Sequence, residues 1–382
     1  MQSGEVRSRP QGVDLKASGD RNLNLSGGKI LFRADAGIMT GTGHVMRSLA
    51  LAQAWQDRGG EASFLCVELP MLLQERLERQ NLSVHVQKAL KAGSEEDANW
   101  TGDMARQCGA SWIVVDGYSF RGAYQKQLTE KGMKVLLFDD YGHSDFYHSD
   151  LVLNGNVNAD ELVYSSRSVG TRLLLGPDYA PLRREFLQLG KKERRPSNGM
   201  LHVLVTMGGS DPDNLTSKIL RQIQASDGTG FKVTVLAGGG NPYVDEIRSL
   251  IGRLEYPCNL LVNAMNIPEL MLEADVAIAA GGSTYLEMIY MKLPCLLFIL
   301  ADNQTTIARK LGELAAVRVA GDSRIMEEGE IGEAVGRFLS NRQLHAKLRE
   351  KCSGLVDGQG AQRIIQAMEN RPGSVVRIAE QK

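Results

Sequence analysis

Residues 29–55, KILFRADAGIMTGTGHVMRSLALAQAW, decide the fold. The apolar run at 29–35 is typical of a buried strand, and apolar residues then recur at helical spacing from Val45 to Trp55. Gly41 and Gly43 lie between the two patterns and predict a tight turn. A strand, a glycine turn and a helix in this order are typical of an α/β protein with a parallel sheet.

The same alternation continues through the chain in two halves. Further strands are predicted in the first half at 62–67, 83–86, 111–116, 134–139 and 150–154, and in the second half at 201–207, 232–238, 259–262, 275–280 and 295–299. A charged stretch containing Pro and Gly, 184–200, separates the halves and is typical of a linker. We therefore predict two doubly wound, Rossmann-like α/β domains, 29–183 and 201–382, with a cleft between them.

Composition limits the class of protein. The chain has 382 residues, 43% of them hydrophobic, and a net charge of −1, which does not favour nucleic acid as a partner. Five widely spaced cysteines form no metal or disulfide pattern and fit a reducing cytoplasm. No apolar run is long enough for a membrane span, so no stable membrane insertion is expected. Residues 1–28 are polar, without a signal-peptide core, and are predicted to be a disordered extension.

His44 follows the first glycine turn and is predicted to lie in the first turn of a helix. There the helix dipole disfavours the protonated ring and leaves a proton acceptor, as a base that activates water requires. A capping or packing histidine remains the alternative at this point. A dinucleotide site of the GxGxxG type is disfavoured, because Met46 stands at the third glycine position and only Glu68 follows the second strand.

The second half contains two more glycine turns after predicted strands. Met207-Gly208-Gly209-Ser210-Asp211 precedes a helix starting near Asn214, and Gly281-Gly282-Ser283-Thr284 opens a helix that contains Glu287. Such turns suit a diphosphate, and Glu287 could accept hydrogen bonds from a ribose diol. Glycine-rich turns are also common without a ligand, and a first-turn acid can be a simple response to the helix dipole.

Polar residues follow other strands as well. Asp116-Gly117-Tyr118 and Asp139-Asp140-Tyr141-Gly142-His143 end strands of the first half, and Asp302-Asn303-Gln304 ends one of the second. Ligands of open α/β sheets bind beyond the carboxyl ends of the strands. These residues are therefore either part of the site or polar turn formers.

The assembled motifs resemble the UDP-sugar hydrolases of pseudaminic acid biosynthesis, in the GT-B-like superfamily of the peptidoglycan N-acetylglucosaminyltransferase. The resemblance runs from Lys29 to the early 300s and rests on FRADAGIMTGTGHVMRSLALA, VVDGY, FDDYG, LGPDYAPLRREF, TMGGSDPDN, PELMLEADVAIAAGGSTYLE and ADNQ. It departs at Ser119-Phe120-Arg121, where an acidic residue is expected, at the additional His143, and in the extension at 1–28.

The resemblance implies a GT-B-like fold and inverting hydrolysis of UDP-2,4-diacetamido-2,4,6-trideoxy-β-L-altropyranose, without a metal or another cofactor. It makes His44 the catalytic residue, directs Tyr118 to the substrate, and assigns UDP to the second-half glycine turns and Glu287. Sequence and resemblance together predict a substrate side of Arg33, Asp35, Gly43, Tyr118, Asp139 and Asn303. They predict a nucleotide side of Gly208, Gly209, Ser210, Asn214, Gly282, Ser283, Thr284, Glu287 and Gln304.

Two other functions fit the same motifs. A GT-B glycosyltransferase would use His44 to deprotonate an acceptor hydroxyl instead of water. It would be expected to carry an exposed basic and apolar patch for a lipid-linked acceptor, and residues 29–180 show no such pattern. A non-catalytic nucleotide-sugar-binding subunit would keep the second-half turns but lose the base, whereas His44 is present.

Overall fold

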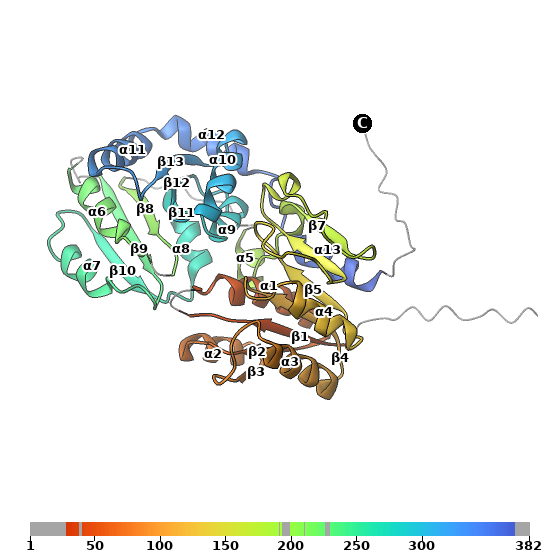
Figure 1. Cartoon of the computed structure of the whole chain (residues 1–382). Helices are drawn as coiled ribbons and strands as arrows, with labels where there is room; N and C mark the ends of the chain where they lie inside the picture. Colours follow the sequence, from red (N-terminus) through yellow and green to blue (C-terminus); the bar gives the residue numbers. More distant parts are fainter. Residues whose placement is uncertain are drawn as a thin grey trace, which may run out of the picture.

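The computed structural model describes residues 28–37, 40–190, 192, 199–209, 211–225 and 230–370. The prediction for the extension therefore lies outside the described residues, apart from Gly28. Within them, two parallel sheets form two domains, and Figure 1 shows the second domain, green to blue, beside the first, red to yellow. The predicted pair of doubly wound α/β domains is confirmed.

The first sheet has the strand order β3-β2-β1-β4-β5-β6-β7. Its strands are β1 (Lys29–Ala34), β2 (Glu61–Cys66), β3 (Ser83–Val86), β4 (Ala110–Asp116), β5 (Val135–Phe138), β6 (Leu151–Asn154) and β7 (Arg172–Leu175). Its helical segments are α1 (Gly43–Gln56), α2 (Met71–Glu78), α3 (Glu95–Cys108), α4 (Gly122–Glu130), η1 (Ala159–Glu161) and η2 (Pro177–Tyr179). The sequence did not predict β7, in which only Leu174 of the four residues is buried.

The second sheet has the order β10-β9-β8-β11-β12-β13. Its strands are β8 (Leu201–Thr206), β9 (Phe231–Ala237), β10 (Cys258–Val262), β11 (Val276–Ala280), β12 (Cys295–Ile299) and β13 (Arg318–Asp322). The remaining helical segments are α5 (Arg184–Leu189), α6 (Leu215–Ala225), α7 (Val244–Ile251), α8 (Ile267–Glu273), α9 (Thr284–Tyr290), η3 (Asp302–Gln304), α10 (Thr305–Glu313), α11 (Glu328–Ser340), α12 (Arg342–Cys352) and α13 (Gly360–Glu369).

Both faces of the first sheet are covered, because alternate strand residues point to opposite sides. Phe32 of β1 packs in the cluster of α1 and α2, whereas Leu31 packs in the cluster of α3 and α4. Buried strands of this kind are typical of parallel sheets between helices. The fold therefore fixes β1 in the middle of the domain, with the turn before α1 at the carboxyl edge of the sheet.

The predicted domain boundaries need two corrections. Helix α13 packs Ile364 and Ile365 against the first sheet, beside Leu153 of β6, although 201–382 was assigned to the second domain. The segments that connect β5, β6 and β7 contain no α-helix, so α13 covers the apolar face of these strands, and Figure 1 shows it in blue beside the yellow strands. The predicted linker begins as helix α5, whose Phe186 is buried in a core of the second domain.

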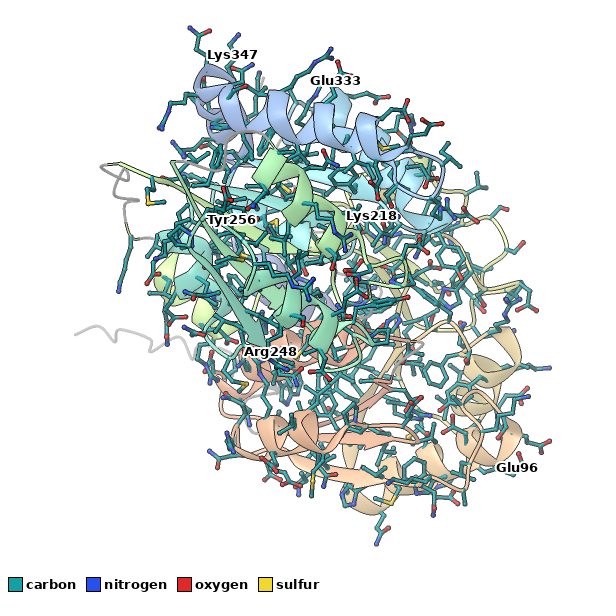
Figure 2. The ribbon with its side chains drawn as sticks, turned by 90° about the vertical axis from the view of Figure 1, so that its left-hand side faces the viewer. Glu96, Lys218, Arg248, Tyr256, Glu333 and Lys347 are labelled. Carbon is teal, nitrogen blue, oxygen red and sulfur yellow. The ribbon has the colours of Figure 1, made fainter. Side chains whose placement is uncertain are left out.

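Figure 2 shows how far the structure extends on both sides of the junction. Glu96 of α3 lies at the outer edge of the first domain, and Glu333 and Lys347 lie on the outermost helices of the second. All three side chains are exposed. The site described below lies between these ends, where the carboxyl edges of the two sheets face each other.

Candidate active site

The catalytic candidate lies at the point where the order of the first sheet reverses. Strands β1 and β4 are neighbours there, and Ala34 pairs with Asp116 in parallel register. The chain leaves β1 toward one side and β4 toward the other, which opens a crevice in folds of this type. The adjacency of these two strands brings His44, after β1, to Asp116, at the end of β4.

His44 is the second residue of α1, and 8% of it is exposed. Its Nδ1 lies 2.7 Å from Oδ1 of Asp116. An ionised carboxylate only accepts hydrogen bonds, so Nδ1 carries the proton and Nε2 is left as the basic nitrogen. This arrangement orients the ring and provides a proton acceptor.

Asp116 is fully buried and is held by Arg47, one turn after His44 on α1. The guanidinium donates from Nε to Oδ2 over 2.7 Å and from Nη2 to Oδ1 over 2.6 Å. Burial by itself raises the pKa of Asp116, but Arg47 and His44 more than offset it, and the pKa lies below its usual value. Asp116 is therefore a carboxylate throughout the neutral range.

The ring of Tyr118 lies beside His44, and its hydroxyl group already donates a hydrogen bond to Asp140. The hydroxyl donates to Oδ2 of Asp140 over 2.9 Å, and the ring meets His44 edge-on at a centroid distance of 4.8 Å. Burial and the Asp140 charge raise the pKa of Tyr118 well above its ordinary value. Tyr118 is 36% exposed and can contact a ligand through its ring, but it is a poor proton donor.

The nucleotide candidates lie at the corresponding reversal of the second sheet. Strands β8 and β11 are neighbours in the middle of that sheet, and each ends in one of the predicted glycine turns. Gly208 has a φ of +82°, which favours glycine, and a Cβ on Gly282 would meet no atom within 4 Å. Ser283 is exposed and Thr284 is half-buried. Backbone amides in such turns can bind an anion.

The turns of the two domains meet at the junction. A Cβ placed on Gly43 would lie 3.5 Å from Oγ of Ser283, and one placed on Gly209 would lie 3.5 Å from Cα of Gly41. A Cβ on Gly238, after β9, would collide with the backbone of Gly209 at 2.6 Å. The sequence analysis did not single out Gly238, which allows the turn after β8 to pack against the turn after β9.

Glu287 lies on α9 beside Arg183, at the start of α5. Its Oε1 accepts from Arg183 Nη2 over 2.9 Å and from Nε over 3.2 Å. Arg183 also donates to Glu185, which in turn accepts from Arg76 of α2. Glu287, which is expected to bind the ribose, is thus oriented by an ion pair with Arg183 through one of its two carboxylate oxygens.

Two residues expected on the substrate side have structural partners instead. The Arg33 side chain has no exposed surface and makes a bidentate pair with Asp97 of α3, at 2.9 and 3.0 Å. Asp35 pairs with Arg33 and accepts from the backbone nitrogens of Val67 and Glu68. A buried guanidinium needs such carboxylate partners, so these residues join β1, α3 and the segment after β2.

Asp139 also differs from its expected role. It is 1% exposed and accepts from the backbone nitrogens of Tyr141 and Gly142 and from the hydroxyl of Tyr147. It forms the turn after β5, whereas its neighbour Asp140 takes part in the His44 network. His143 is buried in the same turn, with its ring edge-on to Tyr118 at 5.6 Å.

Of the remaining predicted residues, Asn214 and Gln304 have structural partners, whereas Asn303 is exposed. Asn214 accepts from the backbone nitrogen of Ser217 and so caps α6, and Gln304 accepts from the backbone nitrogen of Leu300. Asn303 is exposed at the carboxyl side of β12. Ser210 lies outside the described residues.

The sequence analysis left Asp116 and Asp140 open, as site residues or turn formers, and it gave no role to Arg47 or Asn156. Asp116, Asp140 and Asn156 end or follow the neighbouring strands β4, β5 and β6, so the strand ends were the available signal for them, whereas Arg47 lies inside α1. Which of two adjacent acids, Asp139 or Asp140, faces His44 depends on the turn and not on the residue type.

Among the described residues, no group of three His, Cys, Asp or Glu side chains is placed to hold a metal ion. In the same part of the chain, no helix is both long and apolar enough to cross a membrane.

Comparison with solved structures first defines the class of fold. MurG from Acinetobacter baumannii superimposes with a TM-score of 0.60 over 90% of this chain and 99% of that chain, at 16% identity. The protein therefore has the GT-B fold, as the resemblance implied. No family model matches the sequence.

Sequence relatives are more specific. The chain is 25% identical over 342 residues to the spore coat polysaccharide biosynthesis protein SpsG of Bacillus subtilis, covering 88% of this chain and 96% of that protein. It is 24% identical over 287 residues to the UDP-2,4-diacetamido-2,4,6-trideoxy-β-L-altropyranose hydrolase of Campylobacter jejuni, covering 75% and 96%. The resemblance to this hydrolase, first drawn from the motifs, is confirmed.

Proposed function

We propose that the protein hydrolyses a UDP-linked sugar at its anomeric C–O bond. The observation that carries the proposal is the His44–Asp116 pair, whose 2.7 Å contact leaves Nε2 as a base where the two domains meet. Water attacks the anomeric carbon from the side opposite UDP and gives its proton to Nε2. The bond to the diphosphate oxygen breaks with its electron pair leaving on UDP, and the sugar is released with inverted configuration.

Each part of the site has a role in this reaction. Asp116 holds the productive tautomer of His44 and stabilises the imidazolium that forms when the proton arrives. The glycine turns after β8 and β11, with Ser283 and Thr284, bind the diphosphate through backbone amides and hydroxyls. The carboxylate of Glu287, oriented by Arg183, accepts from the ribose hydroxyls, and Gly43 lets the sugar approach α1.

We propose a deoxy sugar with acetamido groups as the substrate class, as in the Campylobacter relative. Tyr118 is 36% exposed, and its ring lies beside His44 and offers an apolar surface to such a sugar. The free sugar would serve the synthesis of a nonulosonic acid of the pseudaminic type. The five cysteines are free thiols, which agrees with a cytoplasmic setting for this reaction.

The test is a panel of purified UDP-sugars in water enriched in ¹⁸O. We expect UDP release, ¹⁸O at the anomeric carbon of the sugar, and none in UDP. Label in UDP would indicate cleavage at phosphorus and would contradict the mechanism. Proton NMR of the first product formed reads the configuration, and retention would exclude direct attack by water.

Transfer to an acceptor is the second candidate, and one observation favours it. Met71 and Leu72, adjacent at the start of α2, are 76% and 61% exposed, although the sequence pattern indicated no apolar surface there. An acceptor with an apolar portion could contact them. UDP release that requires an acceptor, and that is abolished in the double variant Met71→Ser/Leu72→Ser, would show that the protein transfers the sugar to an acceptor. The proposal of hydrolysis would then be wrong.

Hydrolysis is expected to continue in excess EDTA. The proposed anion site consists of backbone amides and hydroxyls, and the sequence has no metal-ligand spacing. Initial rates with EDTA, and after addition of Mg²⁺ or Mn²⁺, provide the measurement. A rate lost with EDTA and restored by either cation would mean that the diphosphate is bound through a metal.

Glu287→Gln is expected to weaken UDP binding by about 1.5–3 kcal/mol, the scale of hydrogen bonds to charged groups. The amide keeps the shape but loses the charge that attracts both Arg183 and the ribose hydroxyls. Calorimetric titration with UDP provides the measurement. Glu333→Gln, an exposed glutamate far from the junction in Figure 2, is the control and should leave the affinity unchanged. Equal affinity for Glu287→Gln and wild type would remove Glu287 from the site.

A further inference from the structure

We propose that Tyr285 is a positioning residue that links the nucleotide turn of the second domain to the catalytic pair of the first; this inference rests on the proposed function. Tyr285 directly follows the Gly281–Thr284 turn and is 1% exposed. Its hydroxyl crosses the domain junction, donating to Oδ1 of Asn156 over 3.0 Å and accepting from the backbone nitrogen of Val157 over 3.3 Å.

Asn156 continues the connection toward His44. Its Nδ2 donates to Oδ1 of Asp140 over 3.0 Å, and the same oxygen accepts from Nη1 of Arg47 over 2.6 Å. Arg47 then holds Asp116, the partner of His44. Hydrogen bonds thus run without a gap from Tyr285 through Asn156, Asp140, Arg47 and Asp116 to the catalytic ring.

The burial of the chain makes its arrangement specific. Tyr285, Asn156 and Asp116 are 1%, 6% and 0% exposed, so a partner lost here is not readily replaced by water. Arg47 keeps the pKa of Asp140 far below its ordinary value despite burial, so the middle of the chain stays charged. The domain arrangement that docks the Tyr285 hydroxyl is therefore also the one in which His44 is correctly held.

Other contacts across the junction are less suited to this task. Asn158 donates to Thr306, and Glu161 pairs with Lys310, but neither connection includes a residue that contacts His44. Glu161 and Lys310 are also partly exposed, where ion pairs contribute little. Tyr285 is adjacent to the proposed diphosphate turn and connected to the base, so it couples nucleotide placement to the chemistry.

The experiment compares Tyr285→Phe with Tyr290→Phe, which loses a hydroxyl from the same helix outside this chain of contacts. Phenylalanine keeps the ring and its packing but leaves Asn156 Oδ1 and the Val157 nitrogen without their partner. For Tyr285→Phe we expect kcat to fall about tenfold, the effect of one lost buried hydrogen bond, while UDP affinity stays within twofold. Tyr290→Phe should match wild type in both.

A second measurement does not depend on turnover. The ring nitrogens of His44 are followed by ¹⁵N NMR and assigned among the six histidines with the His44→Asn variant. Tyr285→Phe should shift the His44 signals, and Asn156→Ala should shift them in the same direction, whereas Tyr290→Phe should not. A purely structural tyrosine would lower the melting temperature without moving these signals, and that result overturns the inference.

The two measurements separate the inference from the function on which it rests. Absent hydrolysis in wild type, with His44 signals that still respond to Tyr285→Phe, would refute the reaction and retain the connection. Normal hydrolysis with unchanged His44 signals and unchanged kcat would refute the connection alone. Additive effects of Tyr285→Phe and Asn156→Ala on kcat would also refute it, because members of one chain should couple.

Discussion

His44→Asn is expected to lower kcat by at least about 10²-fold, and up to about 10⁴-fold, with UDP affinity nearly unchanged. The asparagine amide can still donate to Asp116, as Nδ1 does over 2.7 Å, but it cannot accept the proton from water. The diphosphate turns belong to the other domain, so binding should persist.

Steady-state rates and calorimetry with UDP measure the two quantities, and His85→Asn is the control, since His85 is exposed on β3. A His44 variant that keeps more than a tenth of kcat would make His44 structural. His143 would then be the next candidate for the base, because Asp35 and Asp139 are bonded to backbone amides. Parallel loss of UDP binding and turnover would favour the non-catalytic binding subunit.

Arg47→Met is expected to destabilise the first domain by about 3–5 kcal/mol, the cost of leaving buried charges without their partner. The variant keeps most of the side-chain length but removes the guanidinium that holds Asp116 and Asp140. Urea unfolding followed by tryptophan fluorescence reports this domain, because Trp55, Trp100 and Trp112 all belong to it. Arg79→Met, which breaks an exposed pair with Glu75, should cost less than about 1 kcal/mol.

The loss of stability in Arg47→Met should depend on pH in a defined direction. In the wild type the pKa of Asp116 and of Asp140 is lowered by folding. Their contribution is therefore present above the unfolded carboxyl value of about 4 and is lost as pH falls through the lower folded pKa. Without Arg47, burial raises both pKa values, so the deficit should be largest near neutrality and shrink toward pH 5. A deficit that does not vary with pH would mean that packing, not charge, accounts for the effect.

Site residues could be predicted from the sequence only where backbone geometry and position at a strand end are enough to indicate a binding role. The glycines of the turns and His44 were predicted as site residues because a strand, a turn and a helix follow in immediate succession. Arg33 and Asp139 stand at equivalent strand ends, yet their side chains pair with Asp97 and with the turn of Tyr141. The direction in which a side chain points at a strand end depends on the neighbouring strands. These strands come from distant parts of the sequence.

The amino-acid sequence by itself determined the two α/β domains, the strand ends and the location of the glycine turns, because these follow from local periodicity and from residues such as glycine that permit special turns. Only the tertiary structure decided that α13 returns to the first sheet. The local sequence does not indicate which apolar face of a sheet lacks a covering helix. The tertiary structure also decided that Asp116, Arg47, Asp140, Asn156 and Tyr285 connect to His44 across the junction. These residues are spread over more than 200 positions of the sequence. Parallel strand pairing and domain docking bring them within hydrogen-bond distance of one another.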